Sequence, residues 1–237
     1  MNKDLIKNAV NEAVKKSIAW DYTEKGVCIE TKDYALTPWR FNTRLKELRN
    51  LASGVKSLRK NCSYKSLIAT HKSADISKLL YSEIDTCQWI LNDKIKYVYA
   101  FSQEDKMYSI MAKTYSGVLC QIEISTTLND DTTPIVKHEI VGKEGMISDR
   151  SINEQVPVEA VYLFKDTEKH PEALTDTNLS SLGLTVLENQ ILDNIIHLLI
   201  YQSEVIDATE EKNNYKVIEA VNKSIQSNNK IILEEEQ

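Results

Sequence analysis

Three polar residues in the stretch SKLLYSEIDTCQWIL, residues 77 to 91, are of types that could take part in chemistry. Lys78 and Ser82 lie four residues apart, which places them on one face of a helix, and Asp85 carries a carboxylate that could bind a ligand. The apolar residues recur at spacings of four, three and four, as one buried helical stripe does: Leu80, Ile84, Cys87 and Leu91. This stretch is therefore either a catalytic helix that has lost its acid and base or a core helix that never had them. Asp85 is either a retained functional carboxylate or a carboxylate satisfied by its neighbours in the fold.

Other residues of reactive type are scattered along the chain. The histidines have no histidine partner four residues away and no nearby cysteine: His71, His138, His170 and His197. A metal site is therefore not predicted. His138 lies in an alternating strand pattern and His197 in a helical one, so we interpret both as structural. A triad of Asp75, Ser82 and a histidine has no support in the sequence.

The cysteines form no CxxC pair and lie far apart: Cys28, Cys62, Cys87 and Cys120. We interpret them as reduced thiols, most of them buried. The six glycines nowhere have the spacing of a GxGxxG turn or a phosphate-binding loop, whose backbone must approach phosphate without a Cβ. No cofactor and no cofactor-binding residue is predicted from the chain itself.

Bulk composition excludes several classes of protein. The 237 residues carry a net charge of −6 and are 42% hydrophobic, which is sufficient for one or two cores and does not favour nucleic acid or an anionic membrane as a partner. The N-terminus lacks the apolar segment of a secretory signal, and no window approaches the roughly 20 apolar residues of a membrane span. A soluble, cytoplasmic protein is expected.

Basic residues are concentrated between positions 40 and 65. Eight of them stand against the single acid Glu47: Arg40, Arg44, Lys46, Arg49, Lys56, Arg59, Lys60 and Lys65. This stretch could bind a phosphate-bearing ligand. The alternative is a solvated helix face opposite acidic neighbours, which the scarcity of interleaved aromatic residues favours.

Hydrophobic periodicity predicts the order of the elements. Helices are expected at 3–19, 41–54, 77–91 and 213–227, and another follows the capping box that Thr185 and Glu188 predict. Strands are expected at 27–29, 96–103, 107–115, 118–127, 135–141, 145–149, 156–164 and 230–233. Consecutive strands with short links indicate an antiparallel sheet. The fold class is therefore α+β, with a predominantly antiparallel, open-faced sheet and helices on one face, and the uncovered face would need a partner.

Several stretches resemble one family in the order in which they occur. WRFNTRLKELRNLASG (39–54) is similar to the RFNP helix that opens the C-terminal domain of the Gfo/Idh/MocA oxidoreductases, the relatives of glucose-fructose oxidoreductase and inositol dehydrogenase. Further similar stretches, of which KHEIVGKEGMISD is the most specific, are SEIDTCQWIL (82–91), GVLCQIEIS (117–125), KHEIVGKEGMISD (137–149) and VIEAVNKSIQSNNKIIL (217–233). The resemblance implies the fold of that C-terminal domain, whose open sheet usually makes subunit contacts.

The resemblance also implies where the family's chemistry would lie. Many members carry an aspartate four residues before a histidine on the helix aligned here, and in register with Ile84-Asp85 those positions are Lys78 and Ser82. Neither residue can replace a histidine base near neutral pH, so no catalytic residue is expected. Arg40 and Asn42 match the RFNP motif, in which Thr43 replaces the proline, and with Asp85 they are the possible ligand-binding residues.

The expected domain organisation follows from the same resemblance. Residues 1–29 resemble only the last helix and strand of a Rossmann domain, and 30–237 resemble the oxidoreductase C-terminal domain. Glu24-Lys25-Gly26 resembles the family's EKP loop, but glycine replaces the proline.

Three hypotheses remain open. The first is a non-catalytic or incomplete oxidoreductase-family protein that forms homo-oligomers through the open sheet face. The second is a subunit of a split NAD(P)-dependent sugar or polyol dehydrogenase, completed by a separate Rossmann-domain partner. The third is an anion-binding module that uses residues 40–65.

Overall fold

The computed structural model describes residues 2–14, 20–23, 26–30, 32–54, 62–143, 145–149, 160–165, 172–175, 184–201 and 206–234. The chain forms two compact units. The first unit comprises Met1–Leu45 and Thr177–Ala208, and the second comprises Lys46–Asp176 and Thr209–Gln237. The boundary expected after residue 29 lies inside the first unit. The resemblance of residues 1–29 to the end of a Rossmann domain stays a prediction.

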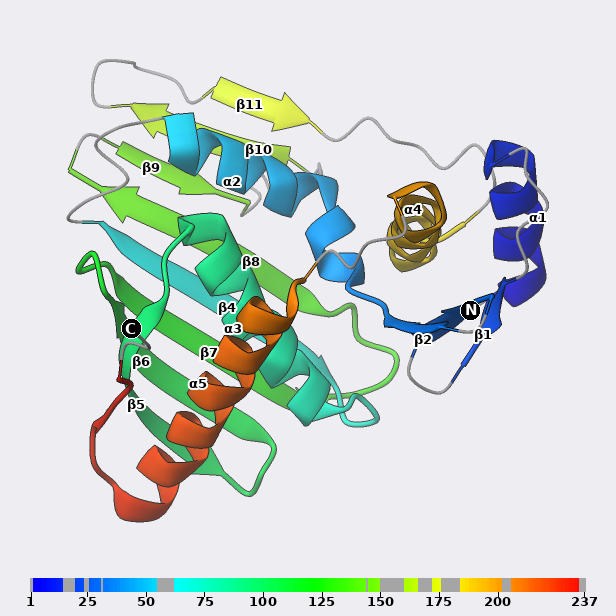
Figure 1. Ribbon diagram of the computed structural model, residues 1–237. Coiled ribbons are helices and arrows are strands. Elements are labelled where there is room, and N and C mark those ends of the chain that lie inside the picture. The colour runs from blue at the N-terminus through cyan, green and yellow to red at the C-terminus, as the bar shows by residue number, and fades with distance from the viewer. Residues whose placement is uncertain are drawn as a thin grey trace. The chain divides into compact units, whose positions relative to one another are not determined.

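The first unit combines a small antiparallel sheet with two helices (Figure 1). Its elements are α1 (Lys3–Val14), β1 (Trp20–Tyr22), β2 (Gly26–Ile29), β3 (Lys32–Ala35), the 3-10 helix η1 (Pro38–Phe41) and α4 (Val186–Tyr201). Ile6 of α1, Val27 of β2 and Ile195 of α4 are fully buried in one shared core. Of the three strands, only β2 is predicted from the sequence, because β1 has three residues and only one residue of β3, Tyr34, is buried.

The start of α4 confirms the capping box. The Thr185 backbone N–H and hydroxyl both donate to Glu188 Oε2, at 2.9 and 3.0 Å, and the Glu188 N–H donates back to Thr185 Oγ1 at 3.3 Å. Glu188 Oε1 also accepts from the backbone N–H of Asn2 at 2.5 Å, which ties α1 to α4. These hydrogen bonds to the ionised carboxylate lower the pKa of Glu188.

The second unit is built on a nine-stranded sheet of described strands in the order β11-β10-β9-β8-β4-β7-β6-β5-β12. Its strands are β4 (Ser63–His71), β5 (Ile95–Gln103), β6 (Met107–Thr114), β7 (Leu119–Leu128), β8 (Ile135–Gly142), β9 (Gly145–Ser148), β10 (Ala160–Lys165), β11 (Glu172–Thr175) and β12 (Ile231–Ile232). All neighbouring pairs are antiparallel except β4 and β7, which are parallel. The α+β class with a predominantly antiparallel sheet is confirmed.

Three helices lie on one face of this sheet, as Figure 1 shows. They are α2 (Thr43–Gly54), α3 (Ile76–Leu91) and α5 (Ala208–Ser227). Alternate strand residues point toward them and are fully or nearly fully buried: Tyr64, Ile110, Ile122, Ile124 and Ile140. The helices contribute Leu48, Ile84, Cys87 and Val217 to the same core, each 0% exposed. Of the cysteines, Cys62, Cys87 and Cys120 are buried, as expected.

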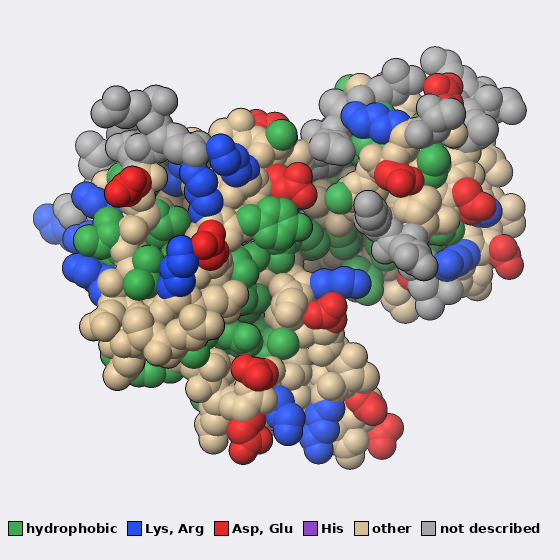
Figure 2. All heavy atoms as spheres, turned by 60° about the horizontal axis from the view of Figure 1, so that its bottom comes forward, with side chains coloured by type: hydrophobic (Ala, Val, Ile, Leu, Met, Phe, Trp, Pro, Cys, Tyr) green, Lys and Arg blue, Asp and Glu red, His purple; other side chains and the backbone are tan. Residues whose placement is uncertain are grey.

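The other face of the sheet carries exposed apolar side chains. Strand register places the following large ones on it: Phe101, Met107, Met111, Leu119, Ile135 and Val141. Polar residues alternate with them in space, among them Gln121 and Glu123, whose side chains hydrogen bond at 2.8 Å. In the face of the molecule seen in Figure 2, acidic and basic side chains are interspersed. None of the helices among the described residues is long and apolar enough to cross a membrane.

Several element bounds differ from the prediction. Residues 63–71 form β4, a central strand, in a segment where the sequence analysis predicts no helix or strand. Helix α5 begins at Ala208, five residues before the expected start at 213. The expected helix from 41 divides into η1 and α2, because Asn42 has extended backbone geometry between them. Residues 15–19 of the expected first helix and 156–159 of an expected strand lie outside the described residues.

Gly145, at the start of β9, should not tolerate a side chain. A Cβ there would lie 2.0 Å from the carbonyl oxygen of Phe164 on the paired strand β10. We expect Gly145→Ala to lower the free energy of unfolding by about 1–3 kcal/mol, the usual cost of overpacking. Urea denaturation monitored by circular dichroism measures it.

Gly54→Ala is the matched control, because a Cβ at Gly54 meets no atom within 4 Å. Its effect should stay within about 0.5 kcal/mol. Equal stabilities for the two variants would contradict the close β9–β10 approach.

Candidate functional site

The first turns of α3 carry the positions at which the resemblance places the family's chemistry. Asp75 caps the helix, and its Oδ1 accepts from the backbone N–H groups of Ser77 and Lys78 at 3.0 and 3.3 Å. The Lys78 side chain is exposed, and Ser82 is half-buried. The Ser82 hydroxyl donates to the Leu79 carbonyl at 2.9 Å. Its proton therefore satisfies the helix backbone and is not held by a base.

A buried cluster of charged groups lies on the sheet side of the same helix. Glu83 of α3, His138 of β8 and Asp149 just after β9 are 4%, 1% and 6% exposed. His138 Nε2 lies 3.2 Å from Glu83 Oε2, and Nδ1 lies 3.0 Å from Asp149 Oδ2. Ser66 of β4 donates to Glu83 Oε2 at 2.8 Å. The cluster thus joins four segments that are distant in the sequence.

Asp149 is also tied to the backbone of β8. Its Oδ1 accepts from the His138 N–H at 2.5 Å, and its own N–H donates to the His138 carbonyl at 3.1 Å. Asp149 therefore forms hydrogen bonds with the backbone N–H, the backbone carbonyl and the ring of His138. This extends the β8–β9 pairing by one residue beyond Ser148.

The charge of His138 follows from this geometry. Burial alone would lower the pKa of His138, but the charge of Glu83 and the hydrogen bond and charge of Asp149 outweigh it and raise the pKa to about 10. The imidazole is therefore protonated at neutral pH, and both ring nitrogens donate to carboxylates. It has no lone pair with which to take a proton from a substrate. The cluster is a structural tie and not a general base.

The three charged residues of this cluster lie in or beside stretches that resemble the family, but the sequence patterns do not link them to one another. His138 and Asp149 both lie in KHEIVGKEGMISD, and Glu83 directly precedes Ile84-Asp85. His138 lies in a strand, β8, as the strand pattern predicts. The pairing of Glu83 with His138 requires knowledge of how α3 crosses β8, which no local pattern supplies.

Asp85 points toward α5 and is 1% exposed. Its Oδ1 accepts from Asn214 Nδ2 at 2.8 Å, and Gln88 Nε2 donates to Asn214 Oδ1 at 2.8 Å. Gln88 Oε1 accepts in turn from Asn213 Nδ2 and from the Ile95 backbone N–H, at 2.8 and 2.9 Å. A buried network of amides and one carboxylate therefore locks α3 to α5. Of the two interpretations of Asp85, this geometry favours the satisfied carboxylate.

The two other sequence-predicted ligand residues belong to the first unit. Arg40, at the end of η1, is 6% exposed. Asn42 is half-buried, and its Oδ1 accepts from the Leu45 backbone N–H at 3.2 Å, which caps the start of α2. Arg40 and Asn42 are neighbours in the chain. The α3 positions Lys78, Ser82 and Asp85 belong to the second unit.

The other histidines and the basic stretch 40–65 are the remaining candidates for a site. His197 of α4 packs edge-on against Phe41, with ring centroids 5.7 Å apart. Arg49 of the basic stretch stacks over Trp89 at 4.8 Å. Lys56, Arg59, Lys60 and His170 lie outside the described residues, so an anion site at 40–65 stays a prediction. Within the described residues, no group of three or more His, Cys, Asp or Glu residues has the arrangement of a metal site.

Known structures share this fold. An oxidoreductase from Thermotoga maritima matches with a TM-score of 0.64 and 13% identity, over 98% of this chain and 69% of that one. An oxidoreductase from Agrobacterium radiobacter, in complex with NAD+, L-tartaric acid and magnesium, matches with a TM-score of 0.66 and 12% identity, over 84% and 64%. A levoglucosan dehydrogenase in complex with NADH and levoglucosan gives 0.62 and 13%, over 84% and 65%.

These matches confirm, at the level of the fold, the resemblance to the C-terminal domain of Gfo/Idh/MocA-type oxidoreductases. The chain spans less than two-thirds of the second and third structures. No protein-family model matches the sequence, and no curated protein matches it significantly.

The buried cluster should make the stability of the protein depend on pH. The folded-state pKa of His138, about 10, lies above its ordinary value of 6.5. The stabilisation from the protonated imidazole is therefore fully present below about pH 6.5 and is lost as the pH rises through 10. We expect the urea midpoint to fall over this range, and His138→Gln to flatten the fall.

Removing the imidazole should leave two carboxylates facing each other in the core. His138→Ala is expected to cost about 3–5 kcal/mol at pH 7, as for other broken buried ion pairs. Lys137→Ala, on the opposite face of the same strand, is the control and should change stability by less than about 0.5 kcal/mol. A His138→Ala variant as stable as this control would show that the cluster does not hold the sheet to α3.

Proposed function

We propose that this chain is an oxidoreductase-fold protein that does not transfer hydride on its own. In this proposal it acts as a substrate-binding and oligomerisation domain. The observation that carries it is the state of α3, where Ser82 donates its proton to the helix backbone and Lys78 extends into solvent. A hydride donor or acceptor needs a neighbouring group that exchanges a proton with the carbinol or carbonyl, and neither of these two positions carries a histidine or a carboxylate.

The nearby histidine does not compensate for this. His138 lies on the sheet side of α3 and is protonated, fully buried and bonded through both nitrogens. His71, at the end of β4, uses its Nε2 in a contact of 2.6 Å with the Thr132 carbonyl, so that nitrogen must donate. The proposal is thus supported by the hydrogen bonds in which Ser82, His71 and His138 are already engaged.

Self-association through the open sheet face is the second part of the proposal. Six large apolar side chains of four strands are 36–59% exposed on that face: Phe101, Met107, Met111, Leu119, Ile135 and Val141. Apolar patches of this kind, interleaved with polar groups, are typical of subunit contacts. A second copy offers the same mixture of apolar and polar side chains, which suits an isologous contact.

The alternative is a subunit that completes an NAD(P)-dependent sugar or polyol dehydrogenase together with a separate Rossmann-domain polypeptide. It is favoured by the coverage of about two-thirds of two cofactor-bound neighbours, one of which holds levoglucosan. In this case Lys78 and Ser82 would face the partner's cofactor. A co-purified protein that binds NAD(P) and restores turnover would support this alternative over the first proposal.

The purified chain should not bind the dinucleotide. Isothermal titration with NAD+, NADH, NADP+ and NADPH is expected to give no saturable binding tighter than about 1 mM. Ser82→Ala and Lys78→Ala should leave this result unchanged. Tight binding by the isolated chain, or turnover of a polyol with added cofactor, would refute the proposal.

Charges on the open face should dissociate the oligomer. The double variant Met111→Asp/Leu119→Asp is expected to lower the mass found by analytical ultracentrifugation to that of one chain, with an unchanged circular dichroism spectrum. Lys106→Asp, in the β5–β6 turn, is the control and should retain the wild-type mass. A wild-type protein that is monomeric at high micromolar concentration would exclude this interface.

A further inference from the structure

Two methionines of β6 lie on the open face of the large sheet. Met107 and Met111 are 40% and 59% exposed. They are four residues apart on a strand in which Ile110 and Ala112, on the opposite face, are buried under the helices. Both thioether side chains are therefore open to solvent in the single chain.

Apolar side chains of the neighbouring strands surround these methionines. Phe101 of β5 is paired with Ser109, which lies between the two methionines, and Leu119 of β7 is paired with Lys113, two residues after Met111. Phe101 and Leu119 are 48% and 56% exposed on the same face. The methionines thus lie within the apolar part of the proposed subunit contact, and they are two of its six large apolar side chains.

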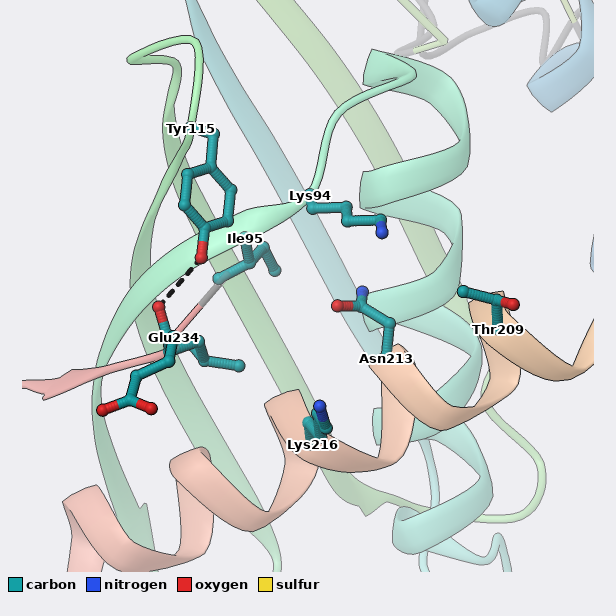
Figure 3. A pocket seen from close by; sticks show the side chains of 8 residues that line it. Lys94, Ile95, Tyr115, Thr209, Asn213, Lys216 and Glu234 are labelled. Atoms are coloured by element: carbon teal, nitrogen blue, oxygen red, sulfur yellow. Dashed lines mark hydrogen bonds between the residues drawn. The ribbon is translucent and has the colours of Figure 1, made fainter. Parts of the chain in front are cut away.

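The strand that carries the methionines is fixed at both ends. After β6, beside the small pocket drawn in Figure 3, the Tyr115 hydroxyl donates to the Leu233 carbonyl at 2.9 Å, and the Tyr115 N–H donates to the Lys94 carbonyl at 3.0 Å. Before β6, the Lys106 carbonyl accepts from the Thr126 N–H at 2.9 Å. The methionines are therefore exposed in the folded strand itself, without any local unfolding.

The other sulfur atoms of the described residues are less accessible. Cys62, Cys87 and Cys120 are buried, and Cys28 and Met146 are half-buried. Burial raises the pKa of Cys28, Cys62 and Cys87, which disfavours the thiolate, the form of cysteine that reacts with oxidants. A thioether reacts through its sulfur lone pair and needs no deprotonation. The exposed methionines are therefore the sulfur sites that an oxidant in solution reaches first.

We propose that Met107 and Met111 are oxidation sites whose conversion to the sulfoxide dissociates the protein at the open sheet face. This inference rests on the subunit contact proposed above. The oxidant is a peroxide, with hydrogen peroxide as the simplest case. The sulfur lone pair attacks one peroxide oxygen, so that an S–O bond forms as the O–O bond breaks. The sulfur loses two electrons, and the second oxygen takes the proton of the first and leaves as water.

The sulfoxide changes the contact because it replaces an apolar group by a polar one. A sulfoxide oxygen buried against Phe101 or Leu119 of a second copy would lose its hydration, which favours the separated chains. Association in turn covers the sulfur atoms, so oxidation should proceed on the free chain. Oxidation and self-association therefore oppose each other, as linked equilibria at one surface must.

Peroxide treatment of the full chain, followed by peptide mass spectrometry and analytical ultracentrifugation, tests the proposal. Met107 and Met111 should form sulfoxide before Met146 does, and faster in dilute, dissociated protein than in associated protein. Conversion of both should raise the dissociation constant about 100-fold, from about tenfold for each thioether removed from the contact. The circular dichroism spectrum should not change.

Two variants serve as controls, each compared before and after peroxide. Met107→Leu/Met111→Leu keeps the apolar volume but has no sulfur at these positions, so its dissociation constant should be the same in both samples. Met146→Leu, in β9, should lose association on treatment as the wild type does. Methionine sulfoxide reductases should restore association of the oxidised wild type.

The possible failures can be told apart. An untreated protein that associates, and that keeps its dissociation constant after both methionines are oxidised, would overturn this inference and leave the open-face contact standing. A loss of association that the Met107→Leu/Met111→Leu variant shares would also overturn it, because the peroxide would then act at another residue. An untreated protein that is monomeric at high micromolar concentration would exclude the contact and this inference together.

Discussion

The pairing of β4 with β7 on one side and β8 on the other joins the large sheet into one piece. Without β4 the sheet divides into two antiparallel groups, β5–β6–β7 with β12 and β8–β9–β10–β11, which have no other strand contact. The β4–β7 pair is the one parallel pair among the described strands, and α3 lies in the connection that begins at β4. The position of α3 over the sheet therefore depends on a strand that comes directly before it in the chain.

The buried ionic cluster stabilises the same junction. Ser66 of β4, Glu83 of α3 and His138 of β8 meet beneath the helix, and Asp149 extends the contact to the end of β9. A lone histidine or carboxylate at such a depth would pay a large desolvation cost, so each group is retained only while the others are present. The cluster thus stabilises this arrangement of the helix and strands relative to alternative arrangements that would bury the same apolar area.

Local pattern predicted the elements whose two faces differ in polarity, and it failed where both faces are mixed. In β7, Cys120, Ile122 and Ile124 alternate with polar residues, and the strand was identified. In β4, Tyr64 and Ser66 face the core while Leu67 faces outward, so the hydrophobic period of two disappears. The helical stripe of α3 was correct in type. The burial of Asp85 and Gln88 on its other flank was not predictable, because their partners lie on α5, more than 120 residues away in the sequence.

Of the two sequence-based interpretations of α3, a core helix describes the segment from Glu83 to Gln88, and the loss of a catalytic pair at Lys78 and Ser82 stays a proposal. From Glu83 to Gln88 every side chain is buried, as in a core helix. Lys78 is exposed and Ser82 is half-buried, so packing restricts these two positions less than the buried ones. A sheet held by backbone pairing and apolar burial persists at 12–13% identity, as the matched structures show. The positions where the resemblance places an acid and a base lie outside the buried segment of α3, where substitutions cost a fold less than in its core.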